Sequence, residues 1–141
     1  MELGRSRSAT KLTNQTNNPF AKYEIAELLG QGQFGKVYKA HLKHRSETSH
    51  PDSNVCAIKI IPLAKLKKNP KLKQLLTNEI HILTSLNHPH IISFRELFVY
   101  KDKIFMVYEY CEGGNLEDIL PLTEAKAISI FTKIIKACAF A

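Results

Sequence analysis

The feature that most constrains the fold is a group of three glycines, Gly30, Gly32 and Gly35, within a short apolar segment. Glycine has no Cβ atom, so the backbone at these positions can bend close to a ligand and present N–H donors to phosphate oxygens. Residues 37–40, Val-Tyr-Lys-Ala, favour a strand because β-branched and aromatic side chains suit a pleated surface. The segment therefore predicts a hairpin whose turn can approach a phosphate group.

Two other phosphate-binding motifs share this glycine spacing but need different flanking elements. A dinucleotide-binding turn leads into a helix, whereas a strand is predicted after Gly35. A Walker A loop would match Gly30, Gly35 and Lys36, but Val37 stands where that motif needs a hydroxyl for magnesium. Both are excluded, and a plain glycine-rich hairpin without a ligand stays open as the alternative.

A lone cation interrupts an apolar strand predicted over residues 55–61. The two-residue period of a strand places Lys59 on one face with Val55, Ala57 and Ile61. Burying an unpaired ammonium group is costly, so we expect Lys59 to find an acidic partner. The alternative is that its long side chain reaches solvent.

The acidic partner is predicted on the next helix. Apolar residues and one acid recur there at steps of three and four, which places on one helical face Leu72, Leu76, Glu79, Leu83 and Leu86. Pairing Glu79 with Lys59 would relieve the burial cost of both; the alternative places Glu79 at the edge of the stripe. The glycine hairpin, the lysine strand and the acid-bearing helix follow one another in an order that predicts one site. The glycines would lie over the phosphates, the lysine would contact the phosphate oxygens, and the acid would orient the lysine.

Runs of β-branched and aromatic residues predict strands over 23–29, 35–43, 55–61, 91–100 and 103–109. Lys101-Asp102 is predicted as a tight turn between the last two, and the polar stretch 44–54 as an exposed hairpin loop. A second helix is expected after Pro121, with Thr123 as its N-cap. Its apolar stripe is Ile128, Phe131, Ile135 and Cys138.

The formal net charge of +7 at pH 7 owes much to a cluster of five lysines without an acid among them: Lys65, Lys67, Lys68, Lys71 and Lys73. No aromatic residue interleaves them, so a stacking platform for nucleic acid is not predicted. We interpret the cluster as a solvated loop and helix start. A docking site for an acidic partner or a phosphorylated segment is the alternative.

The three cysteines, Cys56, Cys111 and Cys138, lie far apart in apolar stretches, which favours a reducing, cytoplasmic setting over a disulfide framework or zinc site. Apolar runs are too short for a membrane span or a secretory signal. The polar residues 1–19 are expected to form a disordered leader. Residues 138–141 formally fit a prenylation motif, but the register of Cys138 with the apolar stripe favours packing instead.

Taken together, these motifs resemble the protein kinase family. The resemblance rests on GQGQFGKV at the glycines, CAIK at Lys59, where Cys56 replaces a commoner valine, and NEIHIL at Glu79, and it continues through NHPHII, IFMVYEY and CEGGNL. It implies an α+β fold: an N-terminal kinase lobe over 20–110, with a five-stranded antiparallel sheet and one packed helix. A hinge and the first helices of an incomplete C-terminal lobe would follow over 111–141.

The resemblance also implies a site for ATP, formed by Leu29, Gly30, Gly32, Gly35, Val37, Ala57, Lys59, Tyr108, Glu109, Cys111 and Asn115. Val37 and Ala57 would enclose the adenine ring, while the Glu109 carbonyl and the Cys111 N–H would meet its edge. Tyr108 would be a bulky gatekeeper at the back of the pocket.

Further roles follow from the same resemblance. Lys59 would contact the α and β phosphates, Glu79 would support that lysine, and Asn115 would meet the ribose. Leu83 and Phe94 match positions of the apolar column that links the two lobes.

The catalytic-loop motif H-R-D and the metal-binding motif D-F-G do not occur in the 141 residues, so no catalytic residue and no magnesium ligand is identified. We expect the ATP-binding portion of an incomplete serine/threonine kinase, inactive alone. The complete domain would use ATP with Mg²⁺ to phosphorylate a protein substrate. A non-catalytic half-domain that binds nucleotide or a partner is the alternative; neither nucleic acid nor membrane is an expected partner.

Overall fold

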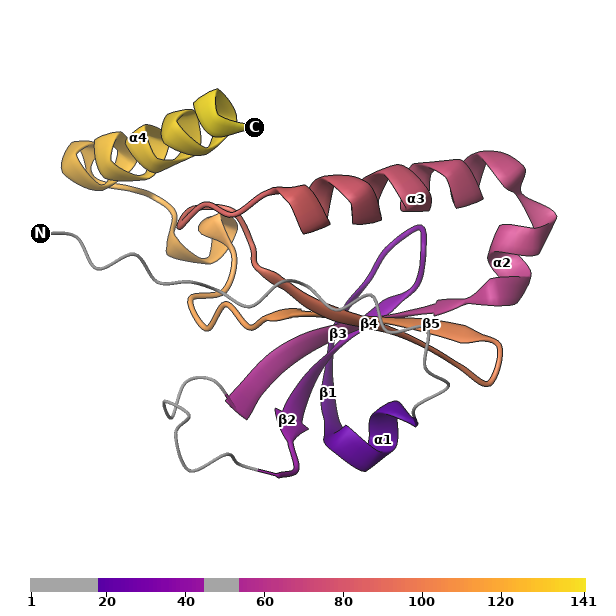
Figure 1. Ribbon diagram of the computed structural model, residues 1–141. Coiled ribbons are helices and arrows are strands. Elements are labelled where there is room, and N and C mark those ends of the chain that lie inside the picture. Colours follow the sequence, from indigo (N-terminus) through magenta and orange to yellow (C-terminus); the bar gives the residue numbers. More distant parts are fainter. Residues whose placement is uncertain (1–17, 45–53) are drawn as a thin grey trace, which may run out of the picture.

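The computed structural model describes residues 18–44 and 54–141 (Figure 1). The expected leader, apart from its last two residues, and the polar loop over 45–53 lie outside the described residues. Five antiparallel strands form one sheet in the order β1-β2-β3-β5-β4. The strands are β1 (Tyr23–Gln31), β2 (Lys36–Leu42), β3 (Val55–Pro62), β4 (Phe94–Tyr100) and β5 (Lys103–Glu109). The predicted five-stranded antiparallel sheet is confirmed.

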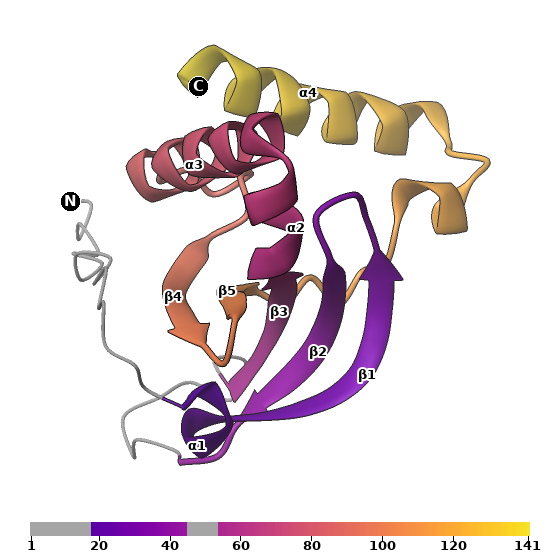
Figure 2. The same cartoon turned by 90° about the vertical axis from the view of Figure 1, so that its right-hand side faces the viewer.

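The helices of the described part are α1 (Pro19–Lys22), α2 (Leu63–Lys68), α3 (Pro70–Ser85), the 3₁₀ turn η2 (Leu116–Ile119) and α4 (Glu124–Phe140). In two perpendicular views, α3 and α4 lie on one side of the sheet and α1 on the other (Figures 1 and 2). No helix among the described residues has the length and apolar character needed to cross a membrane.

The two faces of β5 explain why this strand is apolar almost throughout. Met106 and Tyr108 point to the side where Leu72 and Leu76 of α3 pack. Phe105 and Val107 belong to the opposite cluster, where the ring of Phe20 from α1 meets Phe105 edge-on at 5.7 Å between centroids. Alternate side chains of a strand point to opposite faces, and here both faces are covered.

Local chemistry sets several element boundaries as predicted. Lys101 and Asp102 both adopt positive φ, 43° and 57°, as the tight hairpin turn between β4 and β5 requires. The Asn69 side chain accepts from the Leu72 N–H at 3.1 Å at the start of α3. The predicted N-cap Thr123 accepts from the Lys126 N–H at 3.4 Å and is confirmed as the start of α4.

Two boundaries differ from expectation. The lysine cluster, predicted as a loop and helix start, contains a separate short helix, α2, because Leu66 turns inward and is buried. Strand β4 begins at Phe94 rather than residue 91. Instead, the Ile91 N–H donates to the His88 carbonyl at 3.1 Å in a turn.

Candidate functional site

The glycine hairpin joins β1 to β2, and its turn is closed by the Gly32 N–H, which donates to the Gly35 carbonyl at 2.9 Å. A Cβ atom on Gly35 would lie 2.0 Å from the Ile60 carbonyl oxygen, so only glycine fits against β3 there. A Cβ atom on Gly30 or Gly32 would meet nothing within 4 Å. The third glycine therefore has a packing role, while the first two leave open space beside the backbone.

The predicted pair of Lys59 and Glu79 is confirmed. Lys59 Nζ donates to Glu79 Oε1 at 2.7 Å, joining β3 to α3. The side chains are 18% and 30% exposed, so the pair is half-buried, whereas the sequence predicted a buried pair. Lys59 is the register partner of Val37 in β2, two residues after Gly35. The glycine hairpin and the charge pair are thus neighbours in space.

The sequence reasoning missed Phe34, at the tip of the glycine turn. Lys59 Nζ lies 4.8 Å from the centroid of the Phe34 ring, within range of a cation–π interaction. The half-buried Phe34 also packs against the core cluster on the α3 side. A residue in a turn belongs to no helical or strand period, so no sequence pattern signalled this contact.

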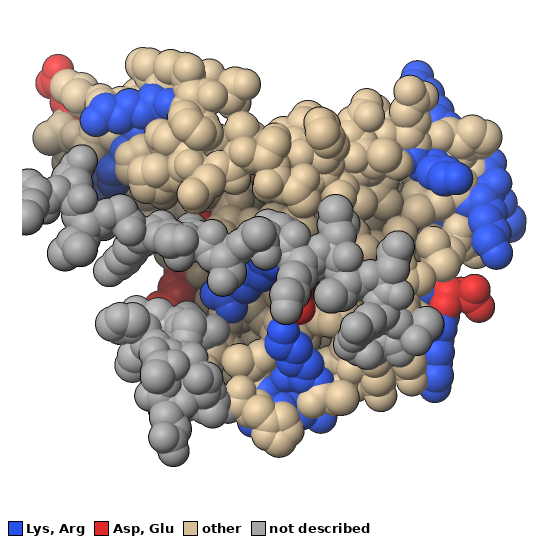
Figure 3. Space-filling view, in the orientation of Figure 1, with Lys and Arg blue, Asp and Glu red and all other residues tan. Residues whose placement is uncertain are grey.

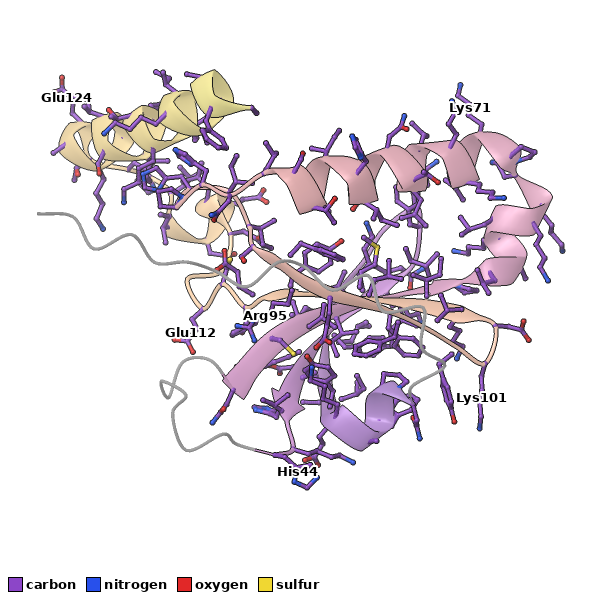
Figure 4. The ribbon with its side chains drawn as sticks, viewed as in Figure 1. His44, Lys71, Arg95, Lys101, Glu112 and Glu124 are labelled. Carbon is purple, nitrogen blue, oxygen red and sulfur yellow. The ribbon has the colours of Figure 1, made fainter. Side chains whose placement is uncertain are left out.

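A cleft of about 310 Å³ lies between β1, β3 and the segment that follows β5. Five predicted site residues line it: Leu29, Ala57, Glu109, Cys111 and Asn115. Four lining residues were not predicted: Ile92, Tyr110, Glu112 and Gly114. Figure 4 shows Glu112 on the loop that leaves the sheet. The predicted hinge segment and the first strand therefore meet across one cavity.

Tyr108 and Val37 are not among the residues that line this cleft. Tyr108 is buried beside it, with its ring edge-on to Phe94 at 5.6 Å between centroids and its hydroxyl donating to Met106 Sδ at 3.6 Å. Burial, and then the nearby Glu79 carboxylate, raise the pKa of Tyr108. Tyr108 is therefore a neutral hydroxyl at neutral pH, placed between the core and the charge pair.

The backbone after β5 is held by its own polar contacts. The Glu109 N–H donates to the Ser93 carbonyl at 2.9 Å, and the Glu109 carboxylate accepts from the Ser93 N–H at 2.9 Å. Further on, the Asn115 N–H donates to Asp118 Oδ2 at 2.7 Å. Cys111, between these anchors, is exposed, and its N–H donates to no residue of the part that the structure describes. Among residues 18–44 and 54–141, this backbone donor at the wall of the cleft therefore has no acceptor.

Leu83 of α3 is partly buried and packs against the core cluster that contains Phe94 of β4, Met106 and Tyr108. No group of three or more His, Cys, Asp or Glu side chains within residues 18–44 and 54–141 is placed to hold a metal ion.

A twisted five-stranded sheet with a glycine hairpin at one edge, a helix bearing the partner of a strand lysine, and a cleft at the end of the last strand is the N-terminal lobe of a protein kinase. The family described as "Protein kinase domain" matches residues 23–141. The chain belongs to the protein kinase family.

Relatives agree with this assignment. The chain is similar to human "NUAK family SNF1-like kinase 1", with 36% identity over 94% of this chain and 20% of the relative. "NUAK family SNF1-like kinase 2" of Pongo abelii is 37% identical over 93% of this chain and 20% of the relative. Mouse "Serine/threonine-protein kinase Nek5" is 39% identical over 67% of this chain and 13% of the relative. The chain spans a fifth or less of the length of these relatives.

Proposed function

We propose that the cleft and the glycine hairpin bind ATP, and that the chain is the ATP-binding portion of a protein serine/threonine kinase. The observation that carries this proposal is the Lys59–Glu79 pair, 2.7 Å long and half-buried beside the glycine hairpin. A salt bridge that only stabilised the fold would have no need of adjoining open space at Gly30 and Gly32. The serine/threonine class is proposed because relatives carry it in their names.

The residues of the cleft suit a purine. Leu29 and Ala57 offer apolar surface from two strands. The partly buried Val37 packs against the core cluster that includes Ala57. The Glu109 carbonyl and the Cys111 N–H would recognise the polar edge of the base, and Asn115 would contact the ribose. Buried Tyr108 would limit how far a ligand reaches toward the core.

The phosphates would lie between the glycine hairpin and β3. Backbone N–H groups of the glycine hairpin would donate to phosphate oxygens, and no side chain at Gly30 or Gly32 stands in the way. The Gly32 N–H would first have to give up its bond to the Gly35 carbonyl. Lys59 would donate to the α and β phosphates, and Glu79 would hold the ammonium group in that direction. The Phe34 ring lies against the Lys59 ammonium group, so it would have to move aside where the phosphates bind Lys59.

When bound with Mg²⁺ in a complete domain, ATP supplies the γ-phosphoryl group that a kinase transfers to a serine or threonine hydroxyl. The residues of this chain bind and orient the nucleotide. We propose that these 141 residues do not transfer the phosphoryl group by themselves, because neither H-R-D nor D-F-G occurs in the sequence.

Titration of the chain with a fluorescent ATP analogue tests the proposal. We expect Lys59→Ala to weaken binding by about tenfold or more, because a charge-assisted contact to phosphate is lost. The matched control is Lys126→Ala on the exposed face of α4, which should leave Kd unchanged. If Lys59→Ala binds as tightly as the unmodified chain, Lys59 has no role in nucleotide binding.

A second experiment, alkylation of the thiols with and without ATP, locates the bound nucleotide. Cys111 lines the cleft and Cys138 lies on α4, and both are exposed. ATP should slow alkylation of Cys111 and leave Cys138 unaffected, as measured by peptide mass spectrometry. Equal rates at Cys111 with and without ATP would place the nucleotide elsewhere.

A further inference from the structure

Lys39 of β2 places a charged side chain close to the proposed nucleotide cleft. Other lysine side chains gather in solvent at the end of the molecule formed by α2 and the start of α3 (Figure 3). The Lys39 side chain, in contrast, is only 28% exposed. Its register partner is Ala57, which lines the cleft, and direct partners in an antiparallel pair share one face of the sheet. Lys39 therefore points to the side of the sheet on which the cleft lies.

Lys39 contacts both sides of the cleft. Its Nζ atom lies 4.8 Å from the centroid of the Tyr110 ring, in the segment that follows β5. The same atom lies 3.5 Å from Glu27 Oε1 of β1. The cleft itself is lined by Tyr110 and, from β1, by Leu29. Lys39 thus joins the strand on one side to the chain segment on the other, and we name these two contacts the Lys39 bridge.

A bulge in β1 brings Glu27 into the Lys39 bridge. The register of β1 with β2 shifts between Ile25 and Leu28. Two residues of β1, Ala26 and Glu27, therefore stand opposite Lys39 alone. Bulges re-aim side chains and are common beside functional sites. In a regular ladder Lys39 would face the alanine, so the bulge supplies the acidic neighbour.

The sheet by itself does not join the two sides of the cleft. Strands β2 and β3 separate β1 from β5 in the strand order, so no backbone ladder links them directly. The Glu27 side chain is 64% exposed, and so open an ion pair contributes little alone. Tyr110 is half-buried and packs against the core cluster on the α3 side. The contact of Lys39 with the Tyr110 ring is therefore the stronger part of the bridge.

Tyr110 lies between the two backbone groups that would meet the base, the Glu109 carbonyl before it and the Cys111 N–H after it. A ring held on both faces restricts how far this backbone can turn, and a preformed site binds its ligand more tightly. We propose that Lys39 is a positioning residue of the nucleotide site. It contacts no part of the nucleotide and acts through Tyr110, by fixing the backbone of residues 109–111 and the separation of the two sides of the cleft. This inference rests on the proposed nucleotide binding.

The test uses three variants and one control. Lys39→Met keeps a long side chain and removes the charge, whereas Lys39→Arg keeps the charge and stacks on an aromatic ring. Tyr110→Leu removes the ring. The matched control is Lys43→Met, at an exposed position just beyond the end of β2 that lies away from the glycine hairpin. Circular dichroism and urea unfolding verify that each variant is folded.

Amide hydrogen exchange without nucleotide measures the restraint directly. Lys39→Met should speed the exchange of peptides that cover residues 109–112 by about threefold or more, and Lys39→Arg should restore the rate to within about twofold. Peptides of α3 should be unchanged in every variant, and Lys43→Met should have no effect. Removal of a nearby positive charge slows base-catalysed exchange, so faster exchange reports motion of the backbone.

Binding of a fluorescent ATP analogue, with adenosine as a competitor, measures the consequence for the site. Lys39→Met should weaken both ligands by the same factor, about three- to fivefold, because the backbone that Tyr110 holds recognises the base. Lys39→Arg should restore both affinities. In the Tyr110→Leu background, Lys39→Met should change them by less than about twofold, since the ring through which it acts is gone.

Three results would overturn the proposal. One is unchanged exchange over residues 109–112, or unchanged affinity, in Lys39→Met. Another is weaker binding of the ATP analogue but not of adenosine, which would place Lys39 on the phosphates. The third is an undiminished effect of Lys39→Met in the Tyr110→Leu background. If the unmodified chain binds neither ligand, the proposed function fails and takes the role of Lys39 in binding with it, whereas hydrogen exchange still shows separately whether Lys39 holds the segment.

Discussion

Helices α3 and α4 are nearly equal in length, 16 and 17 residues, and each begins at a side-chain cap and carries an apolar stripe. Their surroundings differ completely. Helix α3 buries Leu72 and Leu76 against the sheet, whereas α4 buries no residue, and its Phe131 is 59% exposed. An amphipathic sequence produces a helix in both places, but the apolar stripe stabilises the fold only where it packs against the sheet. We infer that the sheet with α3 carries the folding free energy and that α4 adds little.

The strongest test of this contrast compares two phenylalanines. Phe105 in β5 is 1% exposed, so Phe105→Ala should lower the free energy of unfolding by about 3–5 kcal/mol. Phe131→Ala on α4 removes no buried contact, so its effect should stay within about 0.5 kcal/mol. Urea unfolding followed by circular dichroism measures both. If the two variants lose similar free energies of unfolding, Phe131 is packed in solution and α4 does not differ from the sheet in this respect.

Gly35 and Gly30 of the glycine hairpin differ as the two helices do, because Gly35 packs against β3 and Gly30 adjoins open space. Gly35→Ala places a Cβ atom against the Ile60 carbonyl, so the hairpin must shift away from β3 at a cost of about 1–3 kcal/mol. Gly30→Ala meets open space and should be neutral or slightly stabilising, by up to about 1 kcal/mol. The same unfolding assay applies. Equal destabilisation by the two changes would mean that Gly35 is not held against β3.

The sequence predicted the sheet well because its signals are local. Strand β5 coincides with the predicted 103–109, and the predicted tight turn at Lys101 and Asp102 is present, with both residues at positive φ. Helix α2 was missed because six residues with two inward leucines are too short to establish a helical period. The start of β4 was misplaced because Ile91 and Ile92 suit a strand by composition but lie in the irregular segment between the turn at His90 and the first residue of the strand.

The parts of the candidate site that belong to sequence motifs were predicted. Lys59 and Glu79 could be paired because each posed a burial problem that the other solved, and the structure joins them. Their partial exposure was not predictable, since it depends on what covers the pair in three dimensions. Ile92 and Gly114 line the cleft only because the chain folds back on itself, and neither belongs to a periodic pattern. Contacts of this kind depend on the three-dimensional path of the chain and not on a local sequence pattern.

The helix caps give the smallest and most specific test. Asn69→Ala removes the acceptor for the Leu72 N–H, and because α3 unfolds with the sheet, the free energy of global unfolding should fall by about 1 kcal/mol. Thr123→Ala removes the equivalent bond to the Lys126 N–H of α4. It should lower helicity by circular dichroism and leave the cooperative unfolding midpoint unchanged, because α4 buries nothing against the sheet.

The two cap variants therefore separate local from global stability within one chain. If Thr123→Ala lowers the unfolding midpoint as much as Asn69→Ala does, α4 unfolds together with the sheet. The contact that couples them would then be sought where the rings of Phe140 and His88 approach to 5.1 Å, since this joins the end of α4 to the turn after α3. If that contact couples α4 to the sheet, Thr123→Ala should no longer lower the unfolding midpoint once Phe140 has been replaced by alanine.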